Sequence, residues 1–262
     1  MTKNNTWKFF ILVFLLSIPF WVLGFFSQKF TQLTPIKLPL SALMAICPLL
    51  AALILTDKKS KNTLLLEVFD FRKIKNKLWI APTILSMPII AVISYFYLWQ
   101  KKIIEVNYTY TGIELGIFFA VFFIGAIAEE VGWSGYAKRP MIKEFGALKT
   151  GLVIGIIWAV WHIIPYIEMN KTPAWILLQC INTVLLRIVM IWLFSNSNYS
   201  VFTMVLFHTM INISPYLLSK IQVTYDPIIL LSSLLFIVII ILVVLEPKSL
   251  SSFRKRTSGP HV

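Results

Sequence analysis

Two adjacent glutamates, Glu129 and Glu130, follow a long apolar run and stand out as candidates for chemistry. Placing a carboxylate in hydrocarbon is costly, so ionisable residues inside apolar segments usually mark function. Two imidazoles, His162 and His208, lie in other apolar segments, and Asn212 follows His208 by four positions. In a water-poor setting these residue types could hydrolyse a substrate, or they could carry protons or cations.

Hydrolysis has two routes with these side chains. A carboxylate beside an imidazole can polarise a trapped water as general base, while histidine and asparagine can donate hydrogen bonds to an oxyanion. Alternatively, Glu129, His162 and His208 could bind Zn²⁺ and leave one coordination position open for water. Both routes end in hydrolysis of an amide or an ester, and the residue types alone do not choose between them.

The elements that position these residues are predicted to be membrane-spanning helices. The chain has 262 residues, of which 58% are hydrophobic and 13% are charged, and its mean hydropathy is +0.81. Soluble domains carry about a quarter charged residues, so the composition predicts an integral membrane protein. The net charge of +13 fits basic loops beside spans better than a nucleic-acid surface, so no nucleic-acid partner is expected.

A helix needs roughly 17–25 apolar residues to cross the hydrocarbon core. Eight segments are compatible with this length, and they predict an all-α bundle of about eight transmembrane helices in one domain, residues 1–262: 9–26, 38–56, 78–98, 113–137, 151–167, 174–194, 200–218 and 227–245. Most of the 24 Lys and Arg residues fall on one side of this arrangement, with Lys138 at the end of its span. The positive-inside rule then predicts that both termini are cytoplasmic. The Lys-, Asn- and Ile-rich composition favours a bacterial cell membrane.

The candidate residues are expected to reach similar depths. At about 1.5 Å per residue from the cytoplasmic end of its span, His162 lies roughly 16 Å deep, His208 roughly 12 Å and Glu129 roughly 13 Å. Residues four apart share a helix face, so Trp158 should lie over His162. For the same reason His208 should lie over Asn212. A single histidine in a span is more often an interhelical hydrogen-bonding residue, but the joint pattern favours an active site.

Three segments in order, EEVGWSGYA, WAVWH and HTMIN, resemble the motifs of the CPBP family of membrane proteases. That family contains the CaaX-processing endopeptidases of the Rce type and the bacteriocin-processing and self-immunity proteins also called Abi. Its pattern is two glutamates with an arginine four residues after the second, then aromatic-xxx-His, then His-xxx-Asn or Asp. The motif core covers about 119–215, and the eight-span plan fits the family as well.

The resemblance implies a role for each matching residue. Glu129 would be the general base that activates water, and His162 would help to position that water. Glu130 would support the site through charge and hydrogen bonding, while His208 and Asn212 would stabilise the oxyanion. Because the family is described as metalloproteases, a Zn²⁺ cofactor is one alternative, and a metal-free glutamate mechanism is the other.

One position departs from the family pattern. Ser134 occupies the place of the family arginine, and serine cannot supply a charge that would neutralise the glutamate pair. Arg187, roughly 10 Å from the cytoplasmic end of its span, is a candidate replacement. The alternative is that its guanidinium extends to the lipid headgroups.

The leading hypothesis is an intramembrane endopeptidase that cleaves a prenylated, lipidated or leader-bearing peptide at the membrane. A second hypothesis, motivated by Ser134, is a catalytically impaired family member that acts as a scaffold or as a bacteriocin self-immunity protein. An ion-coupled transporter is the third, although the sequence lacks the broken half-helices and repeats typical of such proteins. The lipid bilayer is the expected surroundings in each case, and the sequence identifies neither the substrate nor the oligomeric state.

Overall fold

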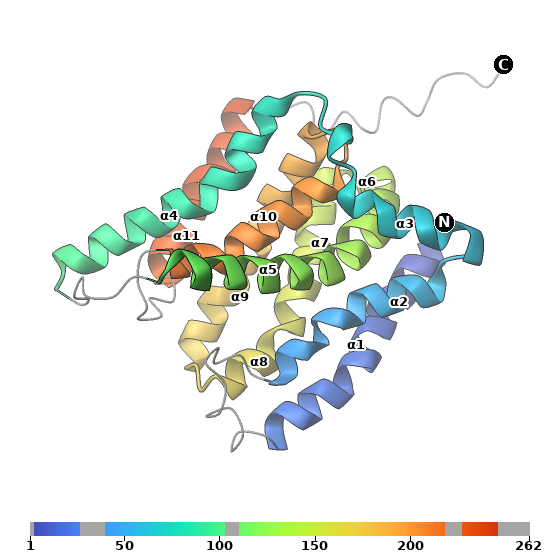
Figure 1. Ribbon diagram of the computed structural model, residues 1–262, viewed down its shortest axis with the longest axis horizontal. Coiled ribbons are helices and arrows are strands. Elements are labelled where there is room, and N and C mark those ends of the chain that lie inside the picture. The colour runs from blue at the N-terminus through green and yellow to red at the C-terminus, as the bar shows by residue number, and fades with distance from the viewer. Residues whose placement is uncertain (1–2, 27–39, 103–109, 218–226, 246–262) are drawn as a thin grey trace.

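The computed structural model describes residues 3–26, 40–102, 110–217 and 227–245, and these residues form an all-α protein (Figure 1). Within them, five helices are long and apolar enough to cross a membrane: Asn5–Phe26, Lys77–Gln100, Gly112–Phe145, Ala147–Glu168 and Pro173–Asn196. Two shorter apolar helices cover Leu40–Leu55 and Pro227–Val243. The prediction of an all-α polytopic membrane protein is therefore confirmed.

The α-helices follow one another in chain order as α1 (Lys3–Phe26), α2 (Cys47–Leu55), α3 (Lys61–Leu66), α4 (Ile80–Gln100), α5 (Gly112–Glu130), α6 (Arg139–Phe145), α7 (Ala147–Trp161), α8 (Ile163–Glu168), α9 (Pro173–Asn196), α10 (Val201–Ile213) and α11 (Pro227–Ile240). A π-helical stretch, η7 (Val131–Lys138), joins α5 to α6. The predicted span 113–137 therefore continues to Phe145. The predicted span 200–218 is represented by the short α10 and a 3₁₀ turn, and its last residue lies outside the described residues.

Local sequence signals fix where the helices that carry the candidate site begin. At the start of α5, the Thr111 hydroxyl accepts a hydrogen bond from the Glu114 amide at 3.2 Å, and the Glu114 carboxylate accepts one from the Thr111 amide at 2.7 Å. This reciprocal pair is a capping box. Thr172 caps α9 ahead of Pro173, and Ser200 caps α10. Each cap satisfies an amide that the first helical turn leaves without a backbone partner.

Close packing brings four helices around one centre. Helix α7 packs most extensively against α9, and α10 packs against α5. A Cβ added at Gly155 on α7 would lie only 2.9 Å from the Cα of Val184 and 3.3 Å from the Cβ of Arg187 on α9. Only glycine permits this approach, as is common where membrane helices pack closely. Helices α5, α7, α9 and α10 consequently meet in the middle of the protein (Figure 1).

Helix α1 supports this centre through aromatic contacts. The ring of Trp133 in η7 lies 5.5 Å from that of Phe9 and 6.0 Å from that of Phe10, measured between centroids. On its other side Trp133 contacts Trp161 of α7 at 5.6 Å. The indole nitrogen of Trp161 donates a hydrogen bond to the Ser17 hydroxyl at 2.8 Å. The first helix of the chain is thus tied to both η7 and α7.

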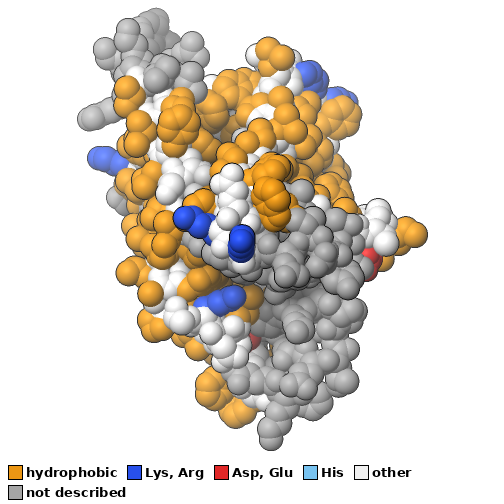
Figure 2. All heavy atoms as spheres, turned by 90° about the vertical axis from the view of Figure 1, so that its left-hand side faces the viewer, with side chains coloured by type: hydrophobic (Ala, Val, Ile, Leu, Met, Phe, Trp, Pro, Cys, Tyr) orange, Lys and Arg blue, Asp and Glu red, His pale blue; other side chains and the backbone are white. Residues whose placement is uncertain are grey.

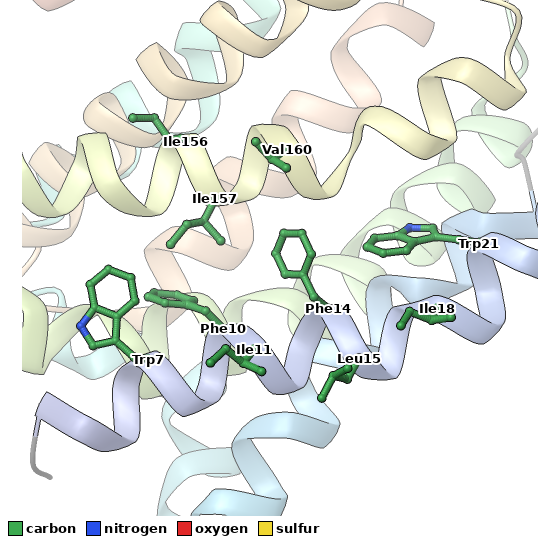
Figure 3. A pocket seen from close by; sticks show the side chains of 10 residues that line it. All are labelled: Trp7, Phe10, Ile11, Phe14, Leu15, Ile18, Trp21, Ile156, Ile157 and Val160. Carbon is green, nitrogen blue, oxygen red and sulfur yellow. The ribbon is translucent and has the colours of Figure 1, made fainter.

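The outer surface is apolar, as a bilayer requires. Hydrophobic side chains dominate the described part of the face that Figure 2 shows. An apolar groove of about 550 Å³ lies between α1 and α7, with Phe14 and Trp21 on one wall and Ile156 and Val160 on the other (Figure 3). Trp158 lies about half a turn from Ile156 and from Val160, so it points from the opposite face of α7. The groove is therefore separated from the candidate site by α7 itself.

The segment between α2 and α4 consists of α3 and several 3₁₀ turns. Its Glu67 carboxylate accepts hydrogen bonds from Arg139 of α6 at 2.8 Å and from Lys73 at 2.9 Å. Phe69 and Phe71 are exposed beside these basic residues. Exposed aromatic and basic side chains together are typical of a segment that lies at the membrane interface.

Candidate active site

Glu129 and Glu130 end α5 as sequence neighbours, but their surroundings differ. Glu129 is 7% exposed, and its Oε2 accepts a hydrogen bond from the indole nitrogen of Trp158 at 2.9 Å. Glu130 is fully buried and is bonded to side chains from three elements, η7, α9 and α10. The two carboxylates are therefore not equivalent.

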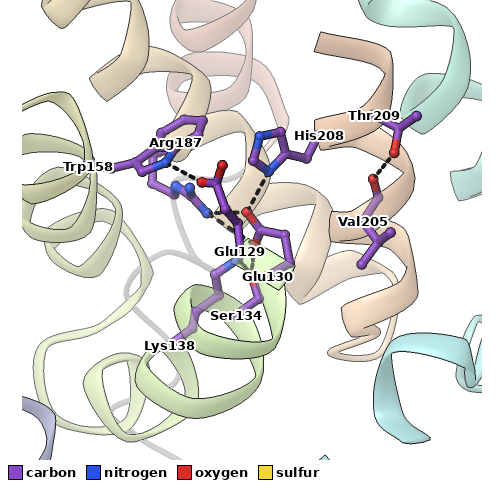
Figure 4. A network of polar contacts seen from close by, with 9 residues as sticks. All are labelled: Glu129, Glu130, Ser134, Lys138, Trp158, Arg187, Val205, His208 and Thr209. Carbon is purple, nitrogen blue, oxygen red and sulfur yellow. Dashed lines mark hydrogen bonds and ion pairs between the residues drawn. The ribbon is translucent and has the colours of Figure 1, made fainter. Parts of the chain in front are cut away.

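Glu130 is the centre of a buried polar network (Figure 4). The Nη1 atom of Arg187 on α9 donates to both carboxylate oxygens, at 3.1 Å and 3.2 Å. The Nδ1 atom of His208 on α10 lies 3.0 Å from Oε1, and the Ser134 hydroxyl donates to Oε2. Because Arg187 is fully buried, its guanidinium pairs with Glu130 and does not extend to the lipid headgroups.

Lys138 extends this network by one more residue. Its Nζ atom donates to the Ser134 hydroxyl at 2.7 Å and lies 4.7 Å from the centroid of the Phe194 ring. Lys138 is fully buried, and the helix continues past it to Phe145. Lys138 was not among the site residues predicted from the sequence. Its spacing of eight positions from Glu130, about two helical turns, is the signal that could have indicated a shared face.

Trp158 on α7 contacts four of the candidate residues. Besides its hydrogen bond to Glu129, its ring stands edge-on to the imidazoles of His162 and His208, with centroid separations of 5.1 Å and 5.2 Å. The guanidinium carbon of Arg187 lies 4.0 Å from the Trp158 ring centroid, which is a close cation–π contact. One indole therefore joins the Glu129 carboxylate to both imidazoles. The expected contact of Trp158 with His162 is among these interactions.

An interruption between two helices orients His162. Helix α7 ends at Trp161, and the His162 amide bonds to the carbonyl of Ala159 at 3.2 Å. The Nδ1 atom of the imidazole lies 2.8 Å from the carbonyl oxygen of Trp158. A carbonyl can only accept, so Nδ1 carries a proton and Nε2 of the neutral ring has a free lone pair. Because His162 is partly exposed, Nε2 can accept a hydrogen bond from water.

The hydrogen-bond partner of His208 also fixes where its imidazole carries a proton. Glu130, when ionised beside Arg187, can only accept, so Nδ1 of His208 donates to it. His208 can then donate from Nε2 as well only if the imidazole is doubly protonated. The formal charges of Glu129 and Glu130 balance those of Arg187 and Lys138, so an imidazolium would add one positive charge. A developing oxyanion could offset that charge.

Asn212 is the candidate that the observed contacts do not join to the network. It is partly buried on α10, one turn after His208. Within the described residues no hydrogen bond links its amide to Glu130 or to the imidazoles. Its side-chain donors are consequently not engaged by the other site residues.

The arrangement of donors does not match a preformed zinc site. A catalytic zinc is typically held by three converging protein ligands. Over the part of the chain that the structure describes, no group of three His, Cys, Asp or Glu side chains is arranged to hold a metal ion. Glu129, His162 and His208 therefore do not form a converging ligand set in this conformation.

Comparison with known proteins matches the region that holds this network. Residues 111–214 match the family described as "Type II CAAX prenyl endopeptidase Rce1-like". A curated relative, "CAAX prenyl protease 2" of Methanococcus maripaludis, is 26% identical over 134 residues. That match covers 48% of each protein, so the chain aligns with about half the length of this relative. All three motifs and the complete Glu130 network lie within residues 111–214. Through this region, the chain resembles the Rce1-like CAAX prenyl endopeptidases of the CPBP family.

Proposed function

We propose that this protein is an intramembrane endopeptidase that hydrolyses a peptide bond in a prenylated, lipidated or leader-bearing peptide. The arrangement of Glu129, Trp158 and His162 carries the proposal. One oxygen of the Glu129 carboxylate is held by the indole, while the other has no hydrogen bond within the described residues. The match to CAAX prenyl endopeptidases supports a lipidated peptide as the substrate class.

Glu129 acts as the general base in this proposal. A water held between its second carboxylate oxygen and Nε2 of His162 gives a proton to Glu129, while the water oxygen bonds to the carbonyl carbon of the substrate. The carbonyl electron pair moves to oxygen, and this oxyanion accepts hydrogen bonds from the Asn212 amide and from protonated His208. Collapse of the intermediate breaks the C–N bond, and Glu129 returns its proton to the leaving amine.

Glu130 takes no proton from the water in this scheme. It accepts the hydrogen bond from Nδ1 of His208 and thereby orients Nε2 of that ring. The Arg187 guanidinium offsets the Glu130 charge, so Glu130 stays an acceptor. Its role is to hold the imidazole that stabilises the oxyanion.

The proposed setting is a bacterial cell membrane, with both termini in the cytoplasm. The excess of Lys and Arg on that side of the predicted topology supports this orientation. Labelling of cysteines introduced near each terminus, in sealed cells and in permeabilised cells, would test it. Labelling in sealed cells by a reagent that cannot cross the membrane would contradict the orientation.

The function is tested by comparing the peptides of membranes that contain the wild type with those that contain Glu129→Ala or His162→Ala. We expect the cleaved peptide to disappear and its precursor to accumulate in both variants, with the protein still inserted. Glu144→Ala is the matched control, because Glu144 is exposed on α6. Wild-type-like cleavage by Glu129→Ala would refute the assignment.

A catalytically impaired scaffold or self-immunity protein is the second candidate, because Ser134 stands where the family has arginine. Full biological activity after Glu129→Gln would favour this candidate, since a protease that uses Glu129 as its base could not show it. An ion-coupled transporter is the third candidate. Glu129-dependent uptake into proteoliposomes would favour that one.

A further inference from the structure

Two fully buried cations, Lys138 and Arg187, approach the carboxylate of Glu130 from different elements. Lys138 comes from the end of η7 and Arg187 from the middle of α9. A cation inside a membrane protein is costly to keep, so two of them at one carboxylate call for an explanation. A single arginine would be enough to neutralise one glutamate.

We propose that Arg187 and Lys138 are positioning residues of the hydrolytic centre, and that Lys138 acts on Glu130 through Ser134. This inference rests on the proposed function. The Ser134 hydroxyl accepts from Nζ of Lys138 at 2.7 Å and donates to Oε2 of Glu130. A hydroxyl can accept and donate at the same time. The ammonium of Lys138 therefore polarises the Ser134 hydroxyl and strengthens the hydrogen bond that this hydroxyl donates to the carboxylate. Ser134 and Lys138 together present to Glu130 what a longer cationic side chain would present directly.

The two cations act by different paths. Arg187 contacts both Glu130, at 3.1 Å, and the Trp158 ring, at 4.0 Å, and Trp158 holds Glu129. Arg187 therefore links the two glutamates. Lys138 contacts Ser134 and the Phe194 ring, and within the described residues no contact connects it directly to Trp158. We expect the loss of Arg187 to disturb both glutamates, whereas the loss of Lys138 disturbs the Glu130 side only.

The first experiment measures cleavage of a farnesylated reporter peptide by the purified protein in phospholipid vesicles. Arg187→Gln should lower kcat about 100-fold and Lys138→Met about 10-fold, each with KM changed by less than about twofold, because small misplacements of catalytic groups cost rate and not binding. Arg187→Lys should recover part of the loss. The controls are Arg72→Gln and Lys143→Met, which replace exposed cations.

The second experiment moves the charge within η7. Lys138→Ala combined with Ser134→Arg deletes the ammonium and places a guanidinium four positions from Glu130. This double variant should have a higher kcat than Lys138→Ala alone. Wild-type kcat in both Arg187→Gln and Lys138→Met would overturn the proposal. So would equal kcat values for Arg187→Lys and Arg187→Gln at equal thermal stability.

A third measurement does not depend on catalysis. In a double-mutant cycle of Glu130→Gln and Arg187→Gln, the melting temperature of the double variant should fall less than the two single decreases added together. Additive decreases would show that the pair is not coupled and would overturn the positioning role. If the wild type hydrolyses no reporter peptide while the cycle shows coupling, the proposed function fails and the buried network stands.

Discussion

The neighbours Glu129 and Glu130 differ sharply in what surrounds them. Glu129 keeps 7% of its surface exposed and accepts from one neutral donor, the Trp158 indole. Glu130 is fully buried and accepts from the Arg187 guanidinium as well as from Ser134 and His208. Successive helical positions point about 100° apart, so one carboxylate faces α7 while the other faces α9 and α10. The proposed mechanism accordingly gives these two identical side chains different roles.

The contrast predicts that Glu129 affects the rate alone, whereas Glu130 affects stability as well as rate. Glu129→Gln should lower kcat about 1,000-fold, the scale expected for the loss of a general base. The melting temperature should hardly change, because the glutamine oxygen can still accept from Trp158. Reporter cleavage in vesicles and thermal unfolding of the same samples measure the two effects. A large decrease in the melting temperature of Glu129→Gln would show that Glu129 also stabilises the fold, which would contradict this prediction.

Glu130→Gln should reduce the free energy of unfolding by about 3–5 kcal/mol, because it leaves the buried Arg187 without an anionic partner. Thermal unfolding in detergent measures this loss. Glu144→Gln, an exposed change on α6, serves as the control and should lie within about 0.5 kcal/mol of the wild type. Unchanged stability would contradict the structural contribution of Glu130, whatever the effect on cleavage.

Trp158→Phe sharpens the comparison on the Glu129 side. Phenylalanine keeps an aromatic ring beside the imidazoles but removes the donor to Glu129, so kcat should fall about tenfold. In the Glu129→Gln background the same change should have little further effect, because the base is already absent. Trp7→Phe, at a half-exposed position on α1, is the control. If Trp158→Phe lowered kcat by the same factor in the wild-type and Glu129→Gln backgrounds, Trp158 would not act through Glu129.

Metal removal should have the smallest effect. Since Glu129, His162 and His208 do not converge on a common point, treatment with a zinc chelator should change kcat less than about twofold. The measurement compares reporter cleavage before and after dialysis against the chelator. Loss of cleavage that added Zn²⁺ restores would show that these side chains rearrange to bind metal when substrate is present.

The helical fold and the residue types of the candidate site were predictable from the sequence, because both depend on local properties. Hydropathy marks a span without knowledge of its neighbours, and a carboxylate or an imidazole in such a span is conspicuous. The spacing of Lys138 from Glu130 was visible in the sequence, but its burial was not, because burial depends on how the π-helical η7 packs. Gly132 in η7 lies against α2, where an added Cβ would come within 2.5 Å of the Pro48 carbonyl oxygen. The 3.6-residue hydrophobic periodicity that predicts a helix does not reveal a tertiary contact of this kind.

The interruption at His162 was missed for a similar reason. The apolar pattern of span 151–167 continues through it, so the sequence predicted one uninterrupted helix. The structure instead ends α7 at Trp161 and uses the His162 side chain at the Trp158 carbonyl. Whether a side chain replaces a backbone amide as the donor to a carbonyl depends on the three-dimensional context and not on composition.

The ion pair between Glu130 and Arg187 also bears on how the protein is made. Helix α9 carries Arg187 as its single charged residue, and a lone arginine at the middle of a helix opposes membrane insertion by about 2.5–3.5 kcal/mol. Glu130 lies earlier in the chain, so α5 is synthesised before α9 emerges. A carboxylate already within the bilayer can receive the guanidinium as α9 arrives and remove much of that cost. Biogenesis of the later helices would then depend on a residue of an earlier one.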